Sequence, residues 1–233
     1  MSPRIAVIAS DDAVPVDLLA SRLPTFTVFH GRDGLPEFGS FDAAVVLGGR
    51  MSVEDTDQAP WLPDLGRLML RCGEAGVPVL AICLGAQLLA VAGGGKVEVG
   101  AWAGPERGVV SISLRPGADQ DPTLGRVHAA LGAGFAAPSM HADAVSELPP
   151  GAVWLASSAQ YPFHAFRVGS ALGVQFHPEA GSQTMCSWAA GHGEPTEPVA
   201  AEMTRHAESL ELLADLIVQG FLAEIATAQR WHP

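Results

Sequence analysis

The stretch VPVLAICLGAQLLA, residues 77–90, decides the fold of this chain. Residues 77–82 form a short apolar run without charge, which is typical of a buried strand. A helical pattern follows from Leu84 to Val91, and the glycines at 93–95 end it. A strand that passes directly into a helix is half of a βαβ unit, so this stretch indicates an α/β protein with a parallel sheet.

Short apolar runs and helical patterns alternate on both sides of this stretch. In the first part of the chain we expect strands at 4–10, 25–30, 41–49 and 77–82, and helices at 14–23, 59–76 and 84–91. Later strands are joined by turns, and we expect them at 109–114, 152–158, 163–169 and 171–177. The predicted fold is an open, mainly parallel central sheet with helices on both faces and an antiparallel extension, which is a flavodoxin-like three-layer sandwich.

The end of the chain has a different pattern. Residues 181–198 are rich in glycine, proline and polar side chains, so we expect an irregular loop there. A final helix follows, and its predicted inner face carries Met203, Ala207, Leu210, Leu213, Ile217 and Phe221. Residues 1–233 show no internal repeat and no domain boundary, and they are interpreted as a single domain that ends in this loop and helix (181–233).

Composition excludes several classes of function. The formal net charge is −12, and an acidic surface repels phosphate backbones, so nucleic acid is not an expected partner. No apolar stretch approaches the ~20 residues that span a bilayer, and the apolar run near the N-terminus is too short for a signal peptide. We therefore expect a soluble cytoplasmic protein that does not bind a membrane.

The three cysteines do not suggest a disulfide framework, because Cys72, Cys83 and Cys186 are odd in number and widely spaced. No Cys-x-x-Cys pair or other zinc-site spacing is present, and we predict no metal and no cofactor. Cys72 falls in a helical pattern and Cys186 in the predicted loop. Neither has the turn context of Cys83, and both are interpreted as non-catalytic.

Cys83 stands where the strand ends and the helix begins. A nucleophile on such a turn lies at the carboxyl edge of the sheet, where the amides of the following helix point at a bound ligand and favour the thiolate. Gly85 and Ala81 on either side are small enough for this nucleophile elbow, although glycine is usual at the position of Ala81. The alternative is that Cys83 is a small core residue, and the local pattern does not decide between the two.

The segment GVQFHPEA, residues 173–180, supplies a candidate base. His177 and Glu179 are separated by one residue in an extended segment, so their side chains leave the same face. A carboxylate beside an imidazole sets its tautomer and stabilises its protonated form, as in a catalytic triad. Taken alone, the pair is also compatible with an ordinary surface contact at the end of a strand.

Together, PVLAICLGAQLLA (78–90) and VQFHPE (174–179) resemble the signatures of class I glutamine amidotransferases. The resemblance extends from the first strand to about residue 180. VLGGRMSVED (46–55) resembles the oxyanion-loop segment of the family. MHADAVSELPPGAVWLASS (140–158) is similar to a stretch typical of free-standing, single-domain members that are like the amidotransferase part of GMP synthetase.

The resemblance implies a role for each matching residue. Cys83 would attack the γ-carboxamide carbon of glutamine, His177 would act as base and acid, and Glu179 would orient the imidazole. Water would cleave the resulting γ-glutamyl thioester after ammonia has left. The amides of Gly49 and Leu84 would form the oxyanion hole. The residues that would bind substrate are Gln87, Met140, His141 and Asp143.

Some positions depart from the family pattern. Arg50 stands where proline often follows the two glycines, which leaves open how rigid this loop is. Met140 replaces a tryptophan that is frequent in free-standing relatives, and the shape of the pocket there is also open. His164 occupies a place where glutamine is common and is interpreted as structural, while Glu106 in GPERG (104–108) has no evident role.

Three functions are compatible with the sequence. The first is a glutamine-hydrolysing amidotransferase subunit or a free-standing glutaminase. Because this sequence has no phosphate-binding loop and no second α/β unit, either a synthetase partner chain would receive the ammonia or there is no acceptor. The second is a γ-glutamyl peptidase or hydrolase that acts on larger γ-glutamyl amides or conjugates. The third is a binding or regulatory module without activity, which the intact set of Cys83, His177 and Glu179 disfavours.

Overall fold

Most strands of the protein belong to one mixed sheet. The computed structural model describes residues 2–11, 14–15 and 17–231. The strands of the large sheet are β1 (Ile5–Ala9), β2 (Phe26–His30), β3 (Ala43–Val46), β4 (Val79–Ile82), β6 (Glu106–Leu114), β7 (Gly134–His141), β9 (Val153–Ser158), β10 (Ala165–Val168) and β11 (Ala171–Val174). A separate antiparallel pair consists of β5 (Lys96–Glu98) and β8 (Ala144–Glu147).

The helices differ widely in length. They are α1 (Asp17–Ala20), α2 (Leu62–Glu74), α3 (Leu84–Ala92), α4 (Leu124–Leu131), α5 (Ser182–Gly191), α6 (Thr196–Arg205) and α7 (Ala207–Trp231), with short 3-10 helices at η1 (Gly31–Asp33) and η2 (Ala118–Gln120). Within the described part of the chain, none of them combines the length and apolar character that a membrane span requires.

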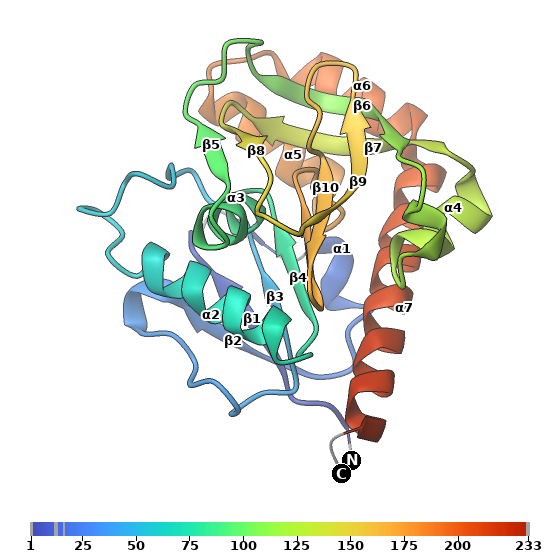
Figure 1. The fold of residues 1–233 in the computed structure, drawn as a ribbon. Coiled ribbons are helices and arrows are strands. Elements are labelled where there is room, and N and C mark those ends of the chain that lie inside the picture. Colours follow the sequence, from blue (N-terminus) through green and yellow to red (C-terminus); the bar gives the residue numbers. More distant parts are fainter. Residues whose placement is uncertain (1, 12–13, 16, 232–233) are drawn as a thin grey trace.

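The sheet has a parallel half and an antiparallel half. Strands β2, β1, β3, β4 and β11 are parallel neighbours in this order, which is the flavodoxin-like order. From β11 onward the neighbours β10, β9, β6 and β7 pair antiparallel. In Figure 1, β6 and β7 lie across the top of the molecule, above the parallel strands. The predicted fold class is therefore confirmed.

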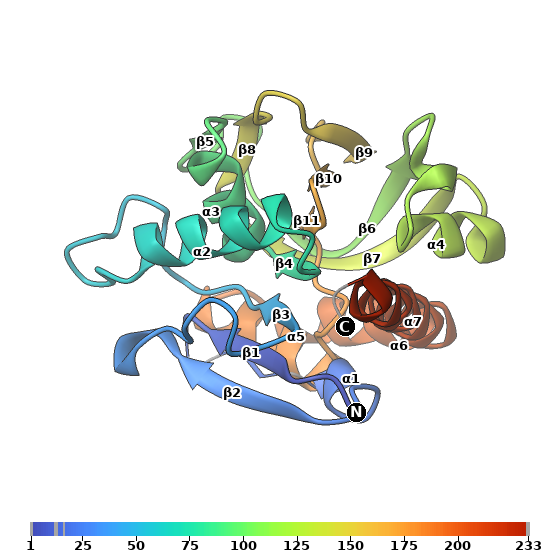
Figure 2. The same cartoon turned by 60° about the horizontal axis from the view of Figure 1, so that its bottom comes forward.

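Alternate residues of β1 belong to two different cores. Val7 lies in a core that also holds the inner side chains of α7, whereas Ile8 lies in a core with side chains of α2 and α3. Because successive side chains of a strand point to opposite faces, the central strands are covered on both sides. Figure 2 shows α2 and α3 on one side of the parallel strands, and α1 and α7 on the other.

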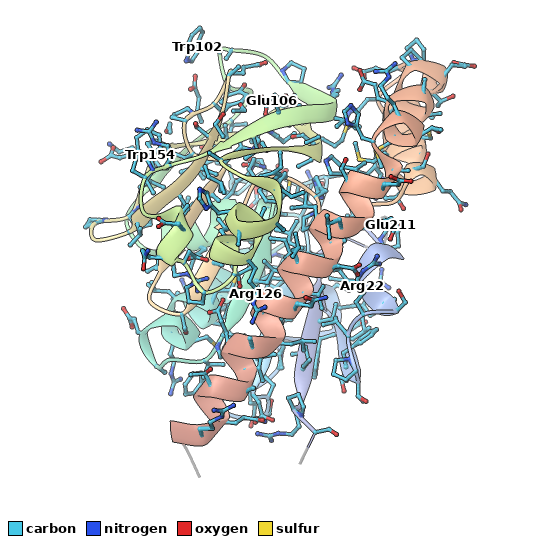
Figure 3. The ribbon with its side chains drawn as sticks, turned by 90° about the vertical axis from the view of Figure 1, so that its right-hand side faces the viewer. Arg22, Trp102, Glu106, Arg126, Trp154 and Glu211 are labelled. Atoms are coloured by element: carbon cyan, nitrogen blue, oxygen red, sulfur yellow. The ribbon has the colours of Figure 1, made fainter. Side chains whose placement is uncertain are left out.

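Helix α7 is tied to the N-terminal part of the chain. Arg22 follows α1 and forms ion pairs with Glu211 and Asp215 of α7. Figure 3 labels Arg22 and Glu211 beside α7, which crosses that view diagonally. The helix expected at 14–23 is shorter than predicted, since α1 covers only Asp17–Ala20, and residue 16 lies outside the described residues.

The prediction of an irregular loop at 181–198 is wrong, because α5 and the start of α6 occupy most of this segment. Gly191 is the last residue of α5, and Pro195 is the N-cap of α6. Pro198 lies in the first turn of α6, where a missing N–H removes no helical hydrogen bond. These residues therefore delimit two helices instead of preventing them.

The final helix is also divided differently from the prediction. Met203 is buried but belongs to α6, and Ala207 is the exposed first residue of α7. The remaining predicted inner residues are buried along α7, and they are Leu210, Leu213, Ile217 and Phe221.

Candidate active site

Cys83 occupies the turn between β4 and α3. Its φ is 51° and its ψ −109°, and among the described residues it is the one non-glycine residue with a positive φ. Such a conformation costs of order 1–3 kcal/mol, which the surrounding structure must supply. The residue stands at the N-terminus of α3, whose first amides have no partner within the helix.

Two glycines allow close packing around this turn. A Cβ atom at Gly85 would lie 2.8 Å from the carbonyl oxygen of Val46, so α3 approaches β3 this closely only with glycine there. A Cβ atom at Gly48 would lie 3.2 Å from Cε1 of His177 and 3.3 Å from Cβ of Cys83. Gly48 therefore packs against both side chains, and Cys83 and His177 are neighbours.

His177 and Glu179 form a buried pair behind Cys83. Nδ1 of His177 is 2.7 Å from Oε1 of Glu179, and the two side chains are 3% and 0% exposed. Burial alone would lower the pKa of His177, but the negative charge of Glu179 and the adjacent sulfur of Cys83 raise it to about 10. The imidazole is therefore positively charged at neutral pH.

Gln175 is a site residue that the sequence analysis does not single out. Its Nε2 donates a hydrogen bond to Sγ of Cys83 at 3.4 Å, and its Oε1 accepts one from Nε2 of Gln87 at 3.2 Å. Donors of this kind stabilise a charged sulfur. The sequence pattern could have indicated Gln175, because this residue precedes His177 by two positions in the same extended segment and so projects to the same side.

A cavity of about 450 Å³ opens in front of Cys83. The other predicted site residues that line it are His177, Gly49, Gln87, Met140, His141 and Asp143. Leu84 and Glu179 are buried and do not line it. The cavity is also lined by residues that the sequence analysis does not place there, which include Arg107, Trp188 and His192. Its size is that of a small-molecule site.

Arg50 holds the loop that follows β3. Its Nε lies 2.6 Å from Oδ2 of Asp11, its Nη2 3.0 Å from Oδ1, and its backbone amide donates to the same carboxylate at 3.2 Å. Two parallel hydrogen bonds give an arginine–carboxylate pair a defined geometry. Where relatives often have proline, this chain thus ties the loop of Gly49 to the segment after β1.

The side chains of His141 and Asp143 support the loop between β7 and β8. The carboxylate of Asp143 accepts a hydrogen bond from the amide of Gly100 at 2.8 Å. The carbonyl oxygen of Asp143 accepts one from Nε2 of Gln87 at 2.9 Å and lies 3.0 Å from Nδ1 of His141. The loop is therefore attached to α3, from which Gln87 projects.

Glu106, which Figure 3 labels on β6, lies in a buried polar cluster beside this loop. Its Oε2 is 3.1 Å from Nε2 of His141 and 2.6 Å from Nε2 of His164, and its Oε1 accepts a hydrogen bond from Ser158 at 2.6 Å. Burial alone would raise the pKa of Glu106, but the hydrogen bonds from both histidines and from Ser158 hold it well below its usual range. Burial lowers the pKa of His164.

The chain is similar to known proteins over most of its length. The family described as glutamine amidotransferase class-I matches residues 25–187. The glutamine-hydrolysing GMP synthase of Thermomicrobium roseum is 36% identical over 135 residues, which are 58% of this chain and 23% of that protein. One of the subunits of the glutamine-hydrolysing GMP synthase of Saccharolobus solfataricus is 36% identical over 145 residues, which are 61% of this chain and 70% of that relative.

This chain thus spans about a quarter of the length of the Thermomicrobium protein and most of the length of the Saccharolobus relative. Solved structures share the fold. A glutamine amidotransferase of Thermotoga maritima has a TM-score of 0.82 at 21% identity and covers 95% of this chain and 99% of its own. A glutamine amidotransferase of Methylobacillus flagellatus has a TM-score of 0.79 at 23% identity, with coverage of 96% and 95%. The chain is a member of the class I glutamine amidotransferase family.

Proposed function

We propose that this protein hydrolyses the side-chain amide of glutamine, with Cys83 as nucleophile, His177 as general acid and base, and Glu179 as the residue that orients the imidazole. One observation carries the proposal. Cys83 stands on a strained turn and lines a cavity, beside an imidazole whose Nδ1 lies 2.7 Å from a buried carboxylate. A core cysteine needs neither the turn nor these neighbours.

The first half of the reaction forms a thioester. The sulfur of Cys83 attacks the carbonyl carbon of the γ-carboxamide of glutamine, and the carbonyl oxygen becomes an oxyanion. The positively charged His177 gives its proton to the amide nitrogen, the carbon–nitrogen bond breaks, and ammonia leaves. Cys83 then holds a γ-glutamyl thioester and His177 is neutral.

The second half hydrolyses the thioester. Neutral His177 takes a proton from water, and the resulting hydroxide attacks the thioester carbon. The carbon–sulfur bond breaks, glutamate is released, and the thiolate and the charged imidazole are regenerated. The net change is glutamine plus water to glutamate plus ammonia.

The oxyanion is stabilised by backbone donors. Leu84 offers an amide at the start of α3, and Gly49 offers one from the loop held by Arg50. Losing one such donor costs about 2.7–4 kcal/mol in other hydrolases. Gln87, Met140, His141 and Asp143 line the cavity and form its substrate-binding wall.

The names of two relatives point to an acceptor for the ammonia. Two relatives that match this chain over 70% of their own length, from Saccharolobus solfataricus and Ignicoccus hospitalis, are by name one of the subunits of a glutamine-hydrolysing GMP synthase. We propose that a cytoplasmic synthetase partner receives the ammonia from this chain as well. Co-purification of the chain from its own cells would identify that partner, and a stimulation of glutaminase activity by it would support the assignment.

The alternative function is a γ-glutamyl peptidase. The observation that favours it is the extent of the cavity, which reaches Arg107 and His192 on the side of α5. Arg107 pairs with Glu194, and its planar guanidinium has further donors that suit the carboxylate of an amino acid joined to the γ-glutamyl group.

A comparison of substrates tests the proposal. Release of glutamate should be measured with glutamine and with γ-glutamyl dipeptides, for the wild type and for Cys83→Ala. A glutaminase prefers glutamine, whereas a peptidase prefers the dipeptides, and Cys83→Ala abolishes either activity. An electrophilic glutamine analogue followed by mass spectrometry should modify Cys83. A wild type that is inactive on all substrates and is not modified would leave only a binding or regulatory module.

A further inference from the structure

Three buried ionisable side chains meet beside the cavity, and none of them makes or breaks a bond in the proposed reaction. Glu106, His141 and His164 come from separate parts of the sequence, and their side chains are only 6%, 1% and 0% exposed. Buried ionisable groups are costly unless they are paired, so their charges must balance.

The hydrogen bonds of His141 define its protonation. Nδ1 lies 3.0 Å from the carbonyl oxygen of Asp143, and Nε2 lies 3.1 Å from Oε2 of Glu106. A carbonyl oxygen only accepts hydrogen bonds, and so does an ionised carboxylate. Both ring nitrogens of His141 therefore carry a proton when Glu106 is ionised, and the ring is an imidazolium.

Glu106 is surrounded by donors. Ser158 donates to Oε1, while His141 and His164 both approach Oε2 with a ring nitrogen. These donors outweigh burial and favour the ionised carboxylate. His164 uses its Nε2 proton for this contact, and its buried Nδ1 has no hydrogen-bond partner among the described residues, as expected for a neutral ring. The cluster then holds one negative and one positive charge.

We infer that Glu106 is a positioning residue, whose carboxylate holds a doubly protonated His141 and thereby fixes the carbonyl group of Asp143 against Gln87. The hydrogen bonds form a continuous series. His141 binds the carbonyl of Asp143, Gln87 binds the same carbonyl, and Gln87 also binds Gln175, which contacts Cys83. The buried ion pair thus sets the position of the wall on which the proposed substrate lies. Its kinetic consequences rest on the proposed function.

A metal ion is the competing occupant of this cluster, because the ligand atoms of Glu106, His141 and His164 lie within 4.8 Å of one another. Tetrahedral zinc with bonds of about 2.0–2.1 Å separates its ligand atoms by about 3.3 Å. The two contacts to Oε2 of Glu106, at 2.6 and 3.1 Å, have instead the length of hydrogen bonds to a charged group. A metal ion on Nε2 of His164 would also move the ring proton to Nδ1, where the described part of the chain offers no acceptor.

Nitrogen-15 NMR of the histidine rings tests the inference on the wild-type protein. In the wild-type protein at neutral pH, His141 should show protons on both ring nitrogens, because both of its partners are acceptors. His141→Gln assigns that signal, because the signal of the charged His177 remains in this variant. A neutral His141 in the wild type at this pH would overturn the inference, and so would one equivalent of zinc bound by the purified protein and absent from His164→Gln.

Kinetics test the positioning role. Glu106→Gln removes the charge at nearly constant shape, so the KM for glutamine should rise about tenfold, the size expected for a lost charged hydrogen bond, while kcat changes less than about threefold. In Glu106→Gln, the rate at which iodoacetamide alkylates Cys83 should stay within about twofold of the wild-type rate, because this small reagent reacts without binding to the substrate-binding wall. Ser158→Ala is the matched control, since it removes a donor to the same carboxylate without touching His141, and its KM should stay within about threefold of wild type.

Two outcomes would overturn the positioning role. One is a wild-type KM in Glu106→Gln, and the other is an equal loss of kcat and of alkylation rate, which indicates general disruption. If the wild type itself lacks glutaminase activity, the proposed function fails, and the NMR result still decides whether the ion pair exists.

Discussion

The indole of Trp188 lies edge-on against the imidazole of His177, with ring centroids 4.8 Å apart and ring planes at 60°. Trp188 belongs to α5, the helix that follows His177 and Glu179 after a few residues, and it lines the cavity. An aromatic ring at this distance limits rotation of the imidazole. Helix α5 therefore contributes to the geometry of the proposed acid and base.

Replacing this ring should affect turnover. Trp188→Ala should lower kcat for glutamine by up to about tenfold, because His177 loses an aromatic neighbour worth about 0.5–1.5 kcal/mol, while Trp188→Phe should retain kcat within about twofold. Steady-state kinetics on glutamine measure the effect. Trp102, whose side chain is 86% exposed, provides the control, and Trp102→Ala should leave kcat unchanged. Equal effects of the two alanine variants would contradict this role.

The backbone strain at Cys83 predicts an unusual order of stabilities. Glycine adopts a positive φ without steric cost, so Cys83→Gly should be more stable than Cys83→Ala by about 1 kcal/mol, even though glycine normally costs about 0.5–1 kcal/mol relative to alanine. Urea unfolding gives the free energies. Both variants should lose at least about 10³-fold in glutamine hydrolysis. An alanine variant more stable than the glycine variant would show that the turn is not strained.

The charge of Glu179 predicts a pH effect. The pKa of His177 is raised to about 10, so the imidazole stays protonated at neutral pH and loses its proton only as the pH rises through that value. The profile of kcat/KM should therefore fall on its alkaline side near pH 10. Glu179→Gln removes the negative charge that opposes the lowering of the His177 pKa by burial. The alkaline limb should therefore move to lower pH by at least about one unit, and kcat should fall about 10²-fold or more.

The pH dependence of Cys83 alkylation is an independent measurement of the charge on His177 beside Glu179. If Glu179→Gln leaves the alkaline limb of both profiles unchanged, Glu179 does not set the charge of His177.

The close approach of α3 to β3 predicts a sensitive position next to the nucleophile. In Gly85→Ala the new Cβ would lie 2.8 Å from the carbonyl oxygen of Val46, so the helix must shift. The variant should lose about 1–3 kcal/mol in unfolding free energy, and its activity should fall because Cys83 moves with the helix. Gly134→Ala is the control, because its Cβ would meet only the carbonyl oxygen of Ile112, at 3.6 Å. Thermal unfolding and glutamine kinetics should be measured for both variants, and equal losses in Gly85→Ala and Gly134→Ala would contradict the prediction.

Local pattern was sufficient to predict the parallel half of the fold. The runs that became β1, β3 and β4 are apolar throughout because both faces of these strands are buried, and such runs are visible in a sequence. Strand β7 was not predicted. It contains Pro138, which pairs with Val109 of β6, and proline within a run argues against a strand. The helices α5 and α6 were missed because their flanking glycine and proline residues resemble a loop.

The candidate site divides in the same way. The turn at Cys83 and the His177–Glu179 pair are local features, since each is encoded within a few residues, and the structure brings them together. Their catalytic roles remain predictions. The contacts of Glu106 with His141 and His164 join residues 35 and 58 positions apart in the sequence. The spacing of residues along the sequence does not predict such contacts, because they form only when β6 pairs with β7 and β9.

Helices α5 and α6 rest on a small apolar cluster of their own. Its buried members are Met140, Ala180, Met185, Ala189, Val199, Met203 and Leu210, and they are separate from the two larger cores around the sheet. Methionine side chains adapt readily to changes in their surroundings. Trp188 packs against this cluster and also against the core that holds α7, so the ring beside His177 transmits the packing of both groups of side chains to the imidazole.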